Sequence, residues 1–259
     1  MAKQFWGMVV EKITSVSNNL VKETVKLQQK KYREQSGKFL LEGYKPVIEA
    51  YDCGLEIEYV FVDENKLNDY EFLKEKVIPT TDVVLKKIST TESAPDCVGV
   101  AFQKKYSLQN LQEYKKVVLL ENIKDAGNLG TILRTSAAFG AELVVLYGDC
   151  VDLYNPKVVR SAVGCLWKLP IVYIKKYDEL VQNFENYTKI ATLPRSQNML
   201  KTYEVKSPFV VMFGSEADGL SEELIAFSND DVKIEMMENV ESLNLSISCG
   251  VVLYKLLIN

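Results

Sequence analysis

The sequence contains no histidine. The lack of histidine excludes catalytic triads built on this residue and most zinc sites. Any general base must therefore be another residue type, and we expect no metal. The five cysteines are an odd number at wide spacings, without a Cys-x-x-Cys pair. We interpret them as buried thiols: Cys53, Cys97, Cys150, Cys165 and Cys249.

Long apolar runs and glycine-rich phosphate loops are also missing. No stretch reaches the roughly 18 apolar residues that a membrane span needs, and the first residues do not resemble a secretory signal. We therefore expect a cytoplasmic protein without a membrane partner. Neither the Walker spacing nor Gly-x-Gly-x-x-Gly occurs, which argues against nucleotide hydrolysis and dinucleotide binding.

The charge balance is acidic overall but basic near the N-terminus. A net charge of −4 argues against a protein that coats nucleic acid through bulk positive charge. Residues 12–38 nevertheless carry seven lysines and arginines against two glutamates. The apolar spacing in residues 20–33 predicts one amphipathic helix with a basic face. That face could contact RNA or simply be solvated, and the pattern leaves both readings open.

Alternating helical and extended patterns predict an α/β protein of two domains. In the first half we expect strands at 39–41, 57–62 and 98–102 and helices at 45–51 and 67–76. The polar stretch 103–113 places a domain boundary near residue 107, giving domains 1–107 and 108–259. In the second half we expect strands at 117–120, 144–146, 171–173, 190–192 and 209–213, with helices between most of them. This order predicts a mostly parallel sheet with binding loops at its carboxyl end.

The loop after the predicted strand 117–120 is the first of three that carry unexpected polar residues. It runs from Asp125 to Arg134, and Asn128 lies where the N-cap of a helix over 129–139 would be. Arg134 is six residues further on and would not share a helix face with Asn128. A simple salt bridge is the alternative explanation for Arg134.

The other two loops follow the strand 209–213 and precede the C-terminal helix. In residues 213–220, Gly214 and Gly219 favour a tight turn, but a turn does not require the carboxylate of Glu216. In residues 234–246, Ser242, Asn244 and Ser246 crowd the start of a helix that is apolar over 247–258. Helix capping explains one of these three polar residues but hardly all of them.

Together these segments resemble the SpoU family, the TrmH-like RNA 2′-O-ribose methyltransferases of the SPOUT superfamily. The resemblance covers motif 1 at 128–134, motif 2 at 213–220 and motif 3 at 242–246, in the family's order. Residues 155–164 are similar to the family's connecting segment, and residues 13–33 and 37–43 to its N-terminal substrate-binding domain. Ala126 and Glu235 stand where family members often have proline.

The resemblance implies a fold, a cofactor and a partner. The catalytic domain would be an α/β-knot, in which the C-terminal chain forms a trefoil knot, preceded by a smaller α/β domain with a ribosomal-protein-like fold. The cofactor would be S-adenosylmethionine, and a homodimer would complete the active site across its interface. The implied cofactor-binding residues are Thr192, Leu193, Gly214, Ile234, Met236, Ser242 and Leu243.

The resemblance also implies roles for individual side chains. Arg134 would act on the ribose 2′-hydroxyl, while Asn128, Glu216 and Asn244 hold it and the nucleotide in place. Whether Arg134 is the general base or stabilises developing negative charge stays open, because a guanidinium with a pKa above about 12 is a poor proton acceptor. RNA phosphates would be contacted by Lys22, Lys26, Lys30, Arg33 and Arg160.

The sequence leaves the substrate and two rival functions open. The domain arrangement favours ribosomal RNA over transfer RNA. One rival is a non-catalytic protein that binds structured RNA and keeps a vestigial cofactor site. The other is a different α/β enzyme acting on a nucleotide or small metabolite. A steep dependence of binding on salt would distinguish a polyanionic substrate from a metabolite.

Overall fold

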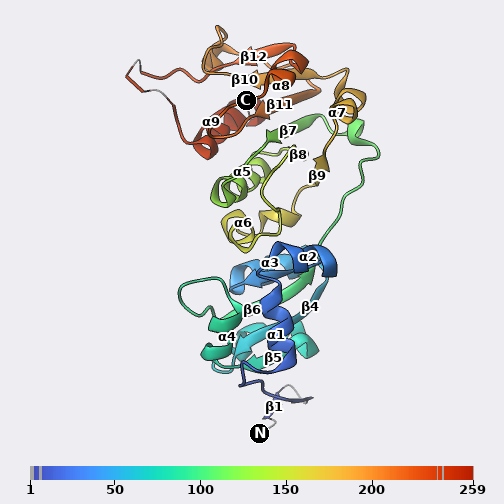
Figure 1. The fold of residues 1–259 in the computed structure, drawn as a ribbon, viewed down its shortest axis with the longest axis vertical. Helices are drawn as coiled ribbons and strands as arrows, with labels where there is room; N and C mark the ends of the chain where they lie inside the picture. The colour runs from blue at the N-terminus through green and yellow to red at the C-terminus, as the bar shows by residue number, and fades with distance from the viewer. Residues whose placement is uncertain (1–2, 6–7, 238, 241, 259) are drawn as a thin grey trace. The chain divides into compact units, whose positions relative to one another are not determined.

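The computed structural model describes residues 3–5, 8–237, 239–240 and 242–258. By their internal contacts these residues divide into two compact units. Unit 1 comprises Met1–Lys104 and Asp152–Trp167, and unit 2 comprises Lys105–Val151 and Lys168–Asn259. Each unit has its own sheet, drawn in Figure 1 from blue at the N-terminus to red at the C-terminus.

Unit 1 is built on a four-stranded mixed sheet with the order β3-β6-β4-β5. Strand β6 is antiparallel to β3 and to β4, while β5 is parallel to β4. The strands are β3 (Lys38–Glu42), β4 (Ile57–Asp63), β5 (Val77–Thr80) and β6 (Cys97–Phe102), and β1 (Lys3–Phe5) pairs separately with β2 (Met8–Val10). The helices are α1 (Asn19–Lys26), α2 (Lys30–Ser36), α3 (Tyr44–Asp52), α4 (Asp82–Ile88) and α6 (Pro156–Ala162), with 3-10 segments η1 (Leu67–Lys76) and η3 (Cys165–Trp167).

The predicted strands of unit 1 are confirmed, but two predicted helices are wrong in form. Instead of one helix over residues 20–33, α1 ends at Lys26 and α2 begins at Lys30. The expected helix at 67–76 is a kinked 3-10 segment, interrupted at Lys74, where φ is +50°. Strand β5 and helix α4 were not predicted.

The Arg33 side chain explains the break between α1 and α2. The prediction that Arg33 contacts RNA is wrong. Its side chain is only 2% exposed. The guanidinium donates to the carbonyl oxygens of Leu27 and Gln28, at 2.8 Å each, and to the Asp152 carboxylate at 2.8 Å through Nε. These carbonyls follow the last turn of α1, where helix carbonyls lack a helical partner. Arg33 therefore stabilises unit 1 and is not available to RNA.

Arg160 on α6 is also bound inside unit 1. Its Nη1 donates to the carboxylate of Glu42 and, at 2.6 Å, to the hydroxyl of Thr90. The Glu42 side chain is 1% exposed, and its second oxygen accepts from the Thr90 backbone N–H at 2.5 Å. A buried carboxylate needs such a partner. The side chain is still 31% exposed, so the contact of Arg160 with RNA stays a prediction.

Unit 2 confirms the predicted parallel sheet. Its six strands are all parallel, in the order β12-β10-β11-β7-β8-β9 (Figure 1). They are β7 (Lys116–Glu121), β8 (Leu143–Tyr147), β9 (Ile171–Ile174), β10 (Thr188–Thr192), β11 (Phe209–Phe213) and β12 (Asp230–Val232). The helices are α5 (Ala126–Ala138), α7 (Tyr177–Phe184), α8 (Glu222–Phe227) and α9 (Leu245–Ile258), with 3-10 segments η2 (Leu111–Glu113) and η4 (Leu200–Thr202).

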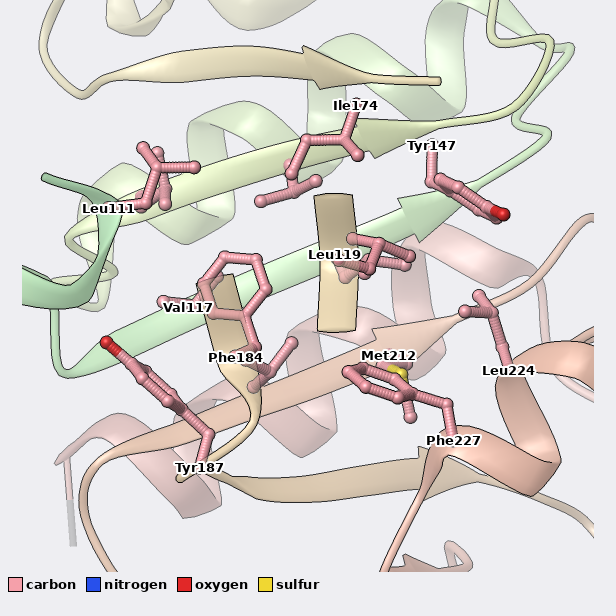
Figure 2. Packing of buried hydrophobic residues seen from close by; sticks show 14 of the residues in the cluster. Leu111, Val117, Leu119, Tyr147, Ile174, Phe184, Tyr187, Met212, Leu224 and Phe227 are labelled. Carbon is pink, nitrogen blue, oxygen red and sulfur yellow. The ribbon is translucent and has the colours of Figure 1, made fainter. Parts of the chain in front are cut away.

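Apolar packing fixes the position of the central strands of unit 2. The residues of β8 and β11 are all buried, as continuous apolar runs in a sheet covered on both faces should be. Figure 2 shows one cluster, in which Leu119 and Met212 from neighbouring strands lie with Phe184 of α7 and Phe227 of α8. Strand β7 lies between β11 and β8 in the sheet, and the chain continues from β7 to β8 on one side before it returns to β11 on the other. The carboxyl ends of β7 and β11 thus form a switch point, where ligands bind in open α/β sheets.

Burial of the cysteines follows the prediction at three positions. Cys97, Cys150 and Cys249 are buried, whereas Cys165 is half-buried and Cys53 is exposed, so the expectation for Cys53 is wrong. Burial raises the pKa of the Cys97 thiol to about 12 and also raises the pKa values of Cys150 and Cys249. These three thiols therefore stay protonated and unreactive near neutral pH. Within the described ranges, no helix is long and apolar enough to cross a membrane.

Replacing Arg33 should strongly destabilise unit 1. Arg33→Met leaves the Asp152 carboxylate and two carbonyl oxygens without their donor, and removal of one partner from a buried ion pair costs about 3 to 5 kcal/mol. Urea denaturation should show this loss in the free energy of unfolding. Lys30→Met removes only the exposed pair with Glu34, at 3.7 Å, and should cost about 0.5 kcal/mol or less. Equal effects of the two substitutions would refute the structural role of Arg33.

Candidate functional site

Three chain segments meet at the carboxyl end of the unit 2 sheet through one asparagine. The side-chain amide of Asn128, on α5, donates to Oε1 of Glu216 at 2.8 Å. Its carbonyl oxygen accepts from the side-chain amide of Asn244 at 3.1 Å. The structure therefore brings together three of the four predicted catalytic residues, one from each motif.

Asn128 can make these bonds because it does not cap its own helix. The predicted N-cap at Asn128 is wrong: α5 begins at Ala126, and Asp125 caps it by accepting from the Asn128 backbone N–H at 2.8 Å. Asn128 thus lies in the first turn of α5, with its side chain directed to the other two segments. A side-chain amide is both donor and acceptor, so it can bond a carboxylate and another amide at once.

Asn244 combines the expected capping role with a role in the site. Its carbonyl oxygen accepts from the backbone N–H of Ser246 at 2.9 Å and from the Ser246 hydroxyl at 2.6 Å. These bonds fix the amide group, so that its N–H₂ end faces Asn128. Of the three polar residues near this helix start, Asn244 caps, Ser246 bonds to the cap, and Ser242 lines the cavity described below.

The motif 2 turn, which carries Glu216, depends on a close approach between two parts of its own backbone. Ser215 and Gly219 exchange two backbone hydrogen bonds of 3.1 Å, and Gly219 has φ of +70°. A Cβ on Gly214 would lie 2.0 Å from the carbonyl carbon and oxygen of Gly219, far inside contact distance. The turn therefore requires glycine at both positions. Glu216 is exposed at its tip.

A buried carboxylate that the sequence reasoning missed supports this turn. Glu121, at the end of β7, is 3% exposed and accepts from the backbone N–H of Ser221 at 2.8 Å. Ser221 caps α8, directly after the turn. The signal for Glu121 was present, because a glutamate that ends an apolar strand beside a binding loop needs a buried partner.

A cavity of about 410 Å³ lies beside the three motifs. Its volume falls within the range of small-molecule sites, about 300 to 1,000 Å³. All seven residues predicted to bind the cofactor line it: Thr192, Leu193, Gly214, Ile234, Met236, Ser242 and Leu243. Sequence reasoning missed other lining residues, among them Pro194, Phe213, Lys233, Ser248 and Val252.

The walls of the cavity suit a ligand with an extended apolar surface and several polar groups. Met236 and Leu243 are each 37% exposed, which leaves apolar surface for a flat ring. The backbone of Lys233, which lines the cavity, pairs with Asn198 and Leu200, at 2.9 and 2.8 Å, and so ties this wall to the segment around residues 198–200. Glu235, in the position of the family's proline, accepts from the Lys201 backbone N–H at 3.2 Å and so ties the same two segments.

Arg134, the fourth predicted catalytic residue, is not brought to the other three within this chain. It is exposed on α5, and among the residues that the structure describes it has no hydrogen-bond or ion-pair partner. The alternative that Arg134 serves an intrachain salt bridge is therefore wrong. No cluster of three or more candidate metal ligands occurs in the described part of the chain.

The predicted RNA-contacting lysines lie in unit 1. Lys22 is exposed, whereas Lys26 and Lys30 pair with Glu23 and Glu34 at 2.7 and 3.7 Å. Exposed pairs of this kind contribute little to stability, so a phosphate can replace the glutamate at small cost. The contact of these lysines with RNA stays a prediction.

Closing the space at Gly214 should disturb the cavity. Gly214→Ala forces the Gly219 backbone to move, which should cost about 1 to 3 kcal/mol of stability and weaken S-adenosylmethionine binding, measured by titration calorimetry. Gly250→Ala is the matched control, since its Cβ would meet only Thr135 Cγ2 at 3.8 Å. Wild-type stability and binding in the Gly214 variant would contradict this account of the turn.

Comparison with known proteins agrees with this geometry. The SpoU rRNA Methylase family matches residues 115–254, and the MRM3-like substrate binding domain matches residues 18–99. An uncharacterized tRNA/rRNA methyltransferase of Synechocystis is 32% identical, over 95% of this chain and 93% of that protein. The 23S rRNA (guanosine(2553)-2′-O)-methyltransferase of Bacillus subtilis is 27% identical, over 95% of this chain and 99% of that protein.

A solved structure is similar over nearly the whole length. The AdoMet-bound rRNA methyltransferase from Sinorhizobium meliloti superimposes with a TM-score of 0.84 at 28% identity, covering 95% of this chain and 97% of that one. This likeness confirms the mixed α/β fold with a smaller N-terminal domain. From its motifs, its cavity and these matches, the chain belongs to the SpoU rRNA methylase family.

Proposed function

We propose that this protein transfers a methyl group from S-adenosylmethionine to a ribose 2′-hydroxyl of ribosomal RNA. The observation that carries the proposal is the hydrogen-bonded set of Asn128, Glu216 and Asn244, located beside a cavity of cofactor size. The relative from Bacillus subtilis, named as a 23S rRNA 2′-O-methyltransferase, supports ribosomal RNA as the substrate.

The cofactor would supply a methyl group on a sulfonium carbon, and the chain's own residues would align the acceptor. Thr192, Leu193, Gly214, Ile234, Met236, Ser242 and Leu243 would hold the cofactor, since all of them line the cavity. The polar set beside the cavity would then orient the ribose, and such alignment supplies much of the rate enhancement in a displacement reaction.

Proton removal from the 2′-hydroxyl would involve Glu216 and Arg134. Glu216 is exposed and engages Asn128 through Oε1, so a lone pair remains to accept from a hydroxyl or an arginine. Arg134 would stabilise the developing alkoxide or bind the neighbouring phosphate, because its guanidinium keeps its charge at neutral pH.

A homodimer would bring Arg134 to the site. Four apolar residues on one face of α9 are between 41% and 55% exposed: Ile247, Val251, Tyr254 and Ile258. Helix α9 packs along α5, where Tyr254 meets Phe139 with ring centroids 5.5 Å apart. A contiguous exposed apolar strip marks an interaction surface, and a twofold interface would bury it against its own copy. Arg134 is exposed on the adjoining helix and would reach the partner's Glu216.

The proposal includes three further expectations for the whole chain. Residues 1–107 and 108–259 would act as the substrate-binding and catalytic domains of a cytoplasmic protein, with the segment 152–167 of the second packed into unit 1. The C-terminal segment would follow the family's trefoil knot. The pairing of Lys233 with the segment around Asn198, followed by packing of α9 on α5, supports such a threaded path.

Methyl transfer to ribosomal RNA lacking the modification tests the function. Arg134→Lys keeps a positive charge but loses the planar fork, so we expect kcat to fall about 100-fold while RNA affinity changes by less than about twofold. Arg195→Lys is the matched control, since Arg195 forms only an exposed 3.8 Å pair with Glu222. Equal loss of binding and activity would contradict the role of Arg134, and a wild-type protein without transfer would contradict the function.

Mixed dimers test whether the site is shared between copies. Arg134→Ala and Glu216→Ala chains should each be inactive as homodimers. Co-expressed, half of the dimers would pair both variants and keep one intact site, so activity should recover to about a quarter of wild type. No recovery in dimers shown to be mixed would place both residues in the same copy.

A further inference from the structure

A second hollow, of about 390 Å³, lies in unit 1 at the helix pair α1 and α2. Tyr32, Tyr59, Lys26, Lys38, Gln35 and Ser36 are among its lining residues. Nothing in the cofactor site uses these residues. The hollow therefore needs an explanation of its own.

The two tyrosines of the hollow are held in different ways. Tyr59, on β4, packs against the core of unit 1, bonds to the Thr24 hydroxyl at 3.1 Å and meets Phe61 edge-on at 5.6 Å. Tyr32, on α2, is half-buried and lies outside that core cluster. In the described part of the chain, its ring contacts are the ammonium groups of Lys26 and Lys31, at 5.7 and 5.8 Å from the centroid. Tyr59 thus forms a fixed wall, whereas the Tyr32 ring is available to a ligand.

Some lysines around the hollow form ion pairs and others do not. Lys26 and Lys38 are paired with Glu23 and Glu58, at 2.7 Å each. By contrast, Lys22 and Lys31 are exposed and have no ion pair among the described residues. The helix pair therefore carries uncompensated positive charge beside an accessible aromatic ring, a combination that fits an aromatic anion such as a nucleotide.

We infer that this hollow binds an unstacked nucleotide of single-stranded RNA, with the base on the Tyr32 ring and the backbone phosphates at Lys31 and Lys26. This deepens the proposed function, on which it rests, by naming where unit 1 holds the RNA. A base that takes the place of an ammonium group at the ring frees that lysine to contact a phosphate. Gln35 offers a side-chain amide to the base edge, whereas the Ser36 hydroxyl already donates to the Tyr32 carbonyl oxygen at 2.7 Å.

The ring of Tyr32 can be tested with the full chain and a short fluorescein-labelled single-stranded RNA of mixed sequence. Fluorescence anisotropy should show the dissociation constant rising about tenfold for Tyr32→Leu, because base stacking on the ring is lost, and less than about twofold for Tyr32→Phe. Tyr44→Leu is the control: Tyr44 is 44% exposed on α3 of the same unit and should leave binding unchanged. Unchanged binding in Tyr32→Leu, or equal loss in the leucine and phenylalanine variants, would overturn the inference.

The charge of Lys31 gives a second test. Lys31→Gln should reduce the slope of log affinity against log salt by about 0.7, the value for one phosphate contact on a single strand. Lys45→Gln removes an exposed lysine of α3 and should leave the slope unchanged. Equal slopes for the two variants would remove Lys31 from the site.

Failure of this inference and failure of the proposed function give different results. If wild-type protein methylates ribosomal RNA while Tyr32→Leu keeps its RNA affinity and its KM for RNA, only the nucleotide site is wrong. If wild-type protein transfers no methyl but binding still depends on the Tyr32 ring, only the catalytic function is wrong. If the proposed function and the nucleotide site are both correct, Tyr32→Leu should raise the KM for RNA about tenfold and leave kcat and cofactor affinity unchanged.

Discussion

The side chain of Asn128 joins the three motif segments of unit 2 by donating to Glu216 and accepting from Asn244. A side-chain amide can do both because it carries a donor and an acceptor, whereas a carboxylate has no donor. The arrangement depends on two neighbours. Asp125 caps α5, which frees Asn128, and the Asn244 carbonyl oxygen caps α9, which turns its amide towards Asn128.

The helices around this hydrogen-bonded set add an electrostatic contribution. Both α5 and α9 begin at the set, and the N-terminus of a helix carries partial positive charge from its aligned peptide groups. Glu216 and a developing ribose alkoxide would both be stabilised there. The parallel sheet places the motif 1 and motif 2 loops side by side, because β7 and β11 are neighbours whose carboxyl ends coincide. Glycine at 214 lets the motif 2 turn close on itself without filling the cavity.

Unit 1 divides its positive charge between structure and binding. Arg33 and Arg160 are each held by a carboxylate, Asp152 and Glu42, inside the unit. Lys22 and Lys31 remain exposed and unpaired within the described residues. Arginine suits the first task because its planar fork satisfies several acceptors at once, and an exposed lysine can contact a phosphate as a point charge. An overall acidic chain can thus still present a local basic surface to RNA.

Sequence patterns were sufficient where a local rule decides the structure. Apolar runs located β7, β8, β9, β10 and β11, and the resemblance to the SpoU family implied seven of the residues that line the cavity. The patterns failed where distant side chains decide. The apolar periodicity predicted one helix in place of α1 and α2, because it does not show that the Arg33 side chain caps the carbonyls between them. Strand β12, with its two aspartates, was missed because its acceptors are satisfied by Ser196 and Tyr203, far away in the sequence. Arg134 has no hydrogen-bond or ion-pair partner among the described residues, and we propose that a second copy supplies one.

The most direct measurement is the identity of the methylated nucleoside. Ribosomal RNA treated with the protein and labelled S-adenosylmethionine would be digested completely and its nucleosides separated by mass spectrometry. The account predicts that all label is found in a single 2′-O-methylribose nucleoside, whose linkage to the next nucleotide resists alkali because its 2′-hydroxyl is blocked. Label on a base, or a protein that binds cofactor and RNA but transfers nothing, would contradict it.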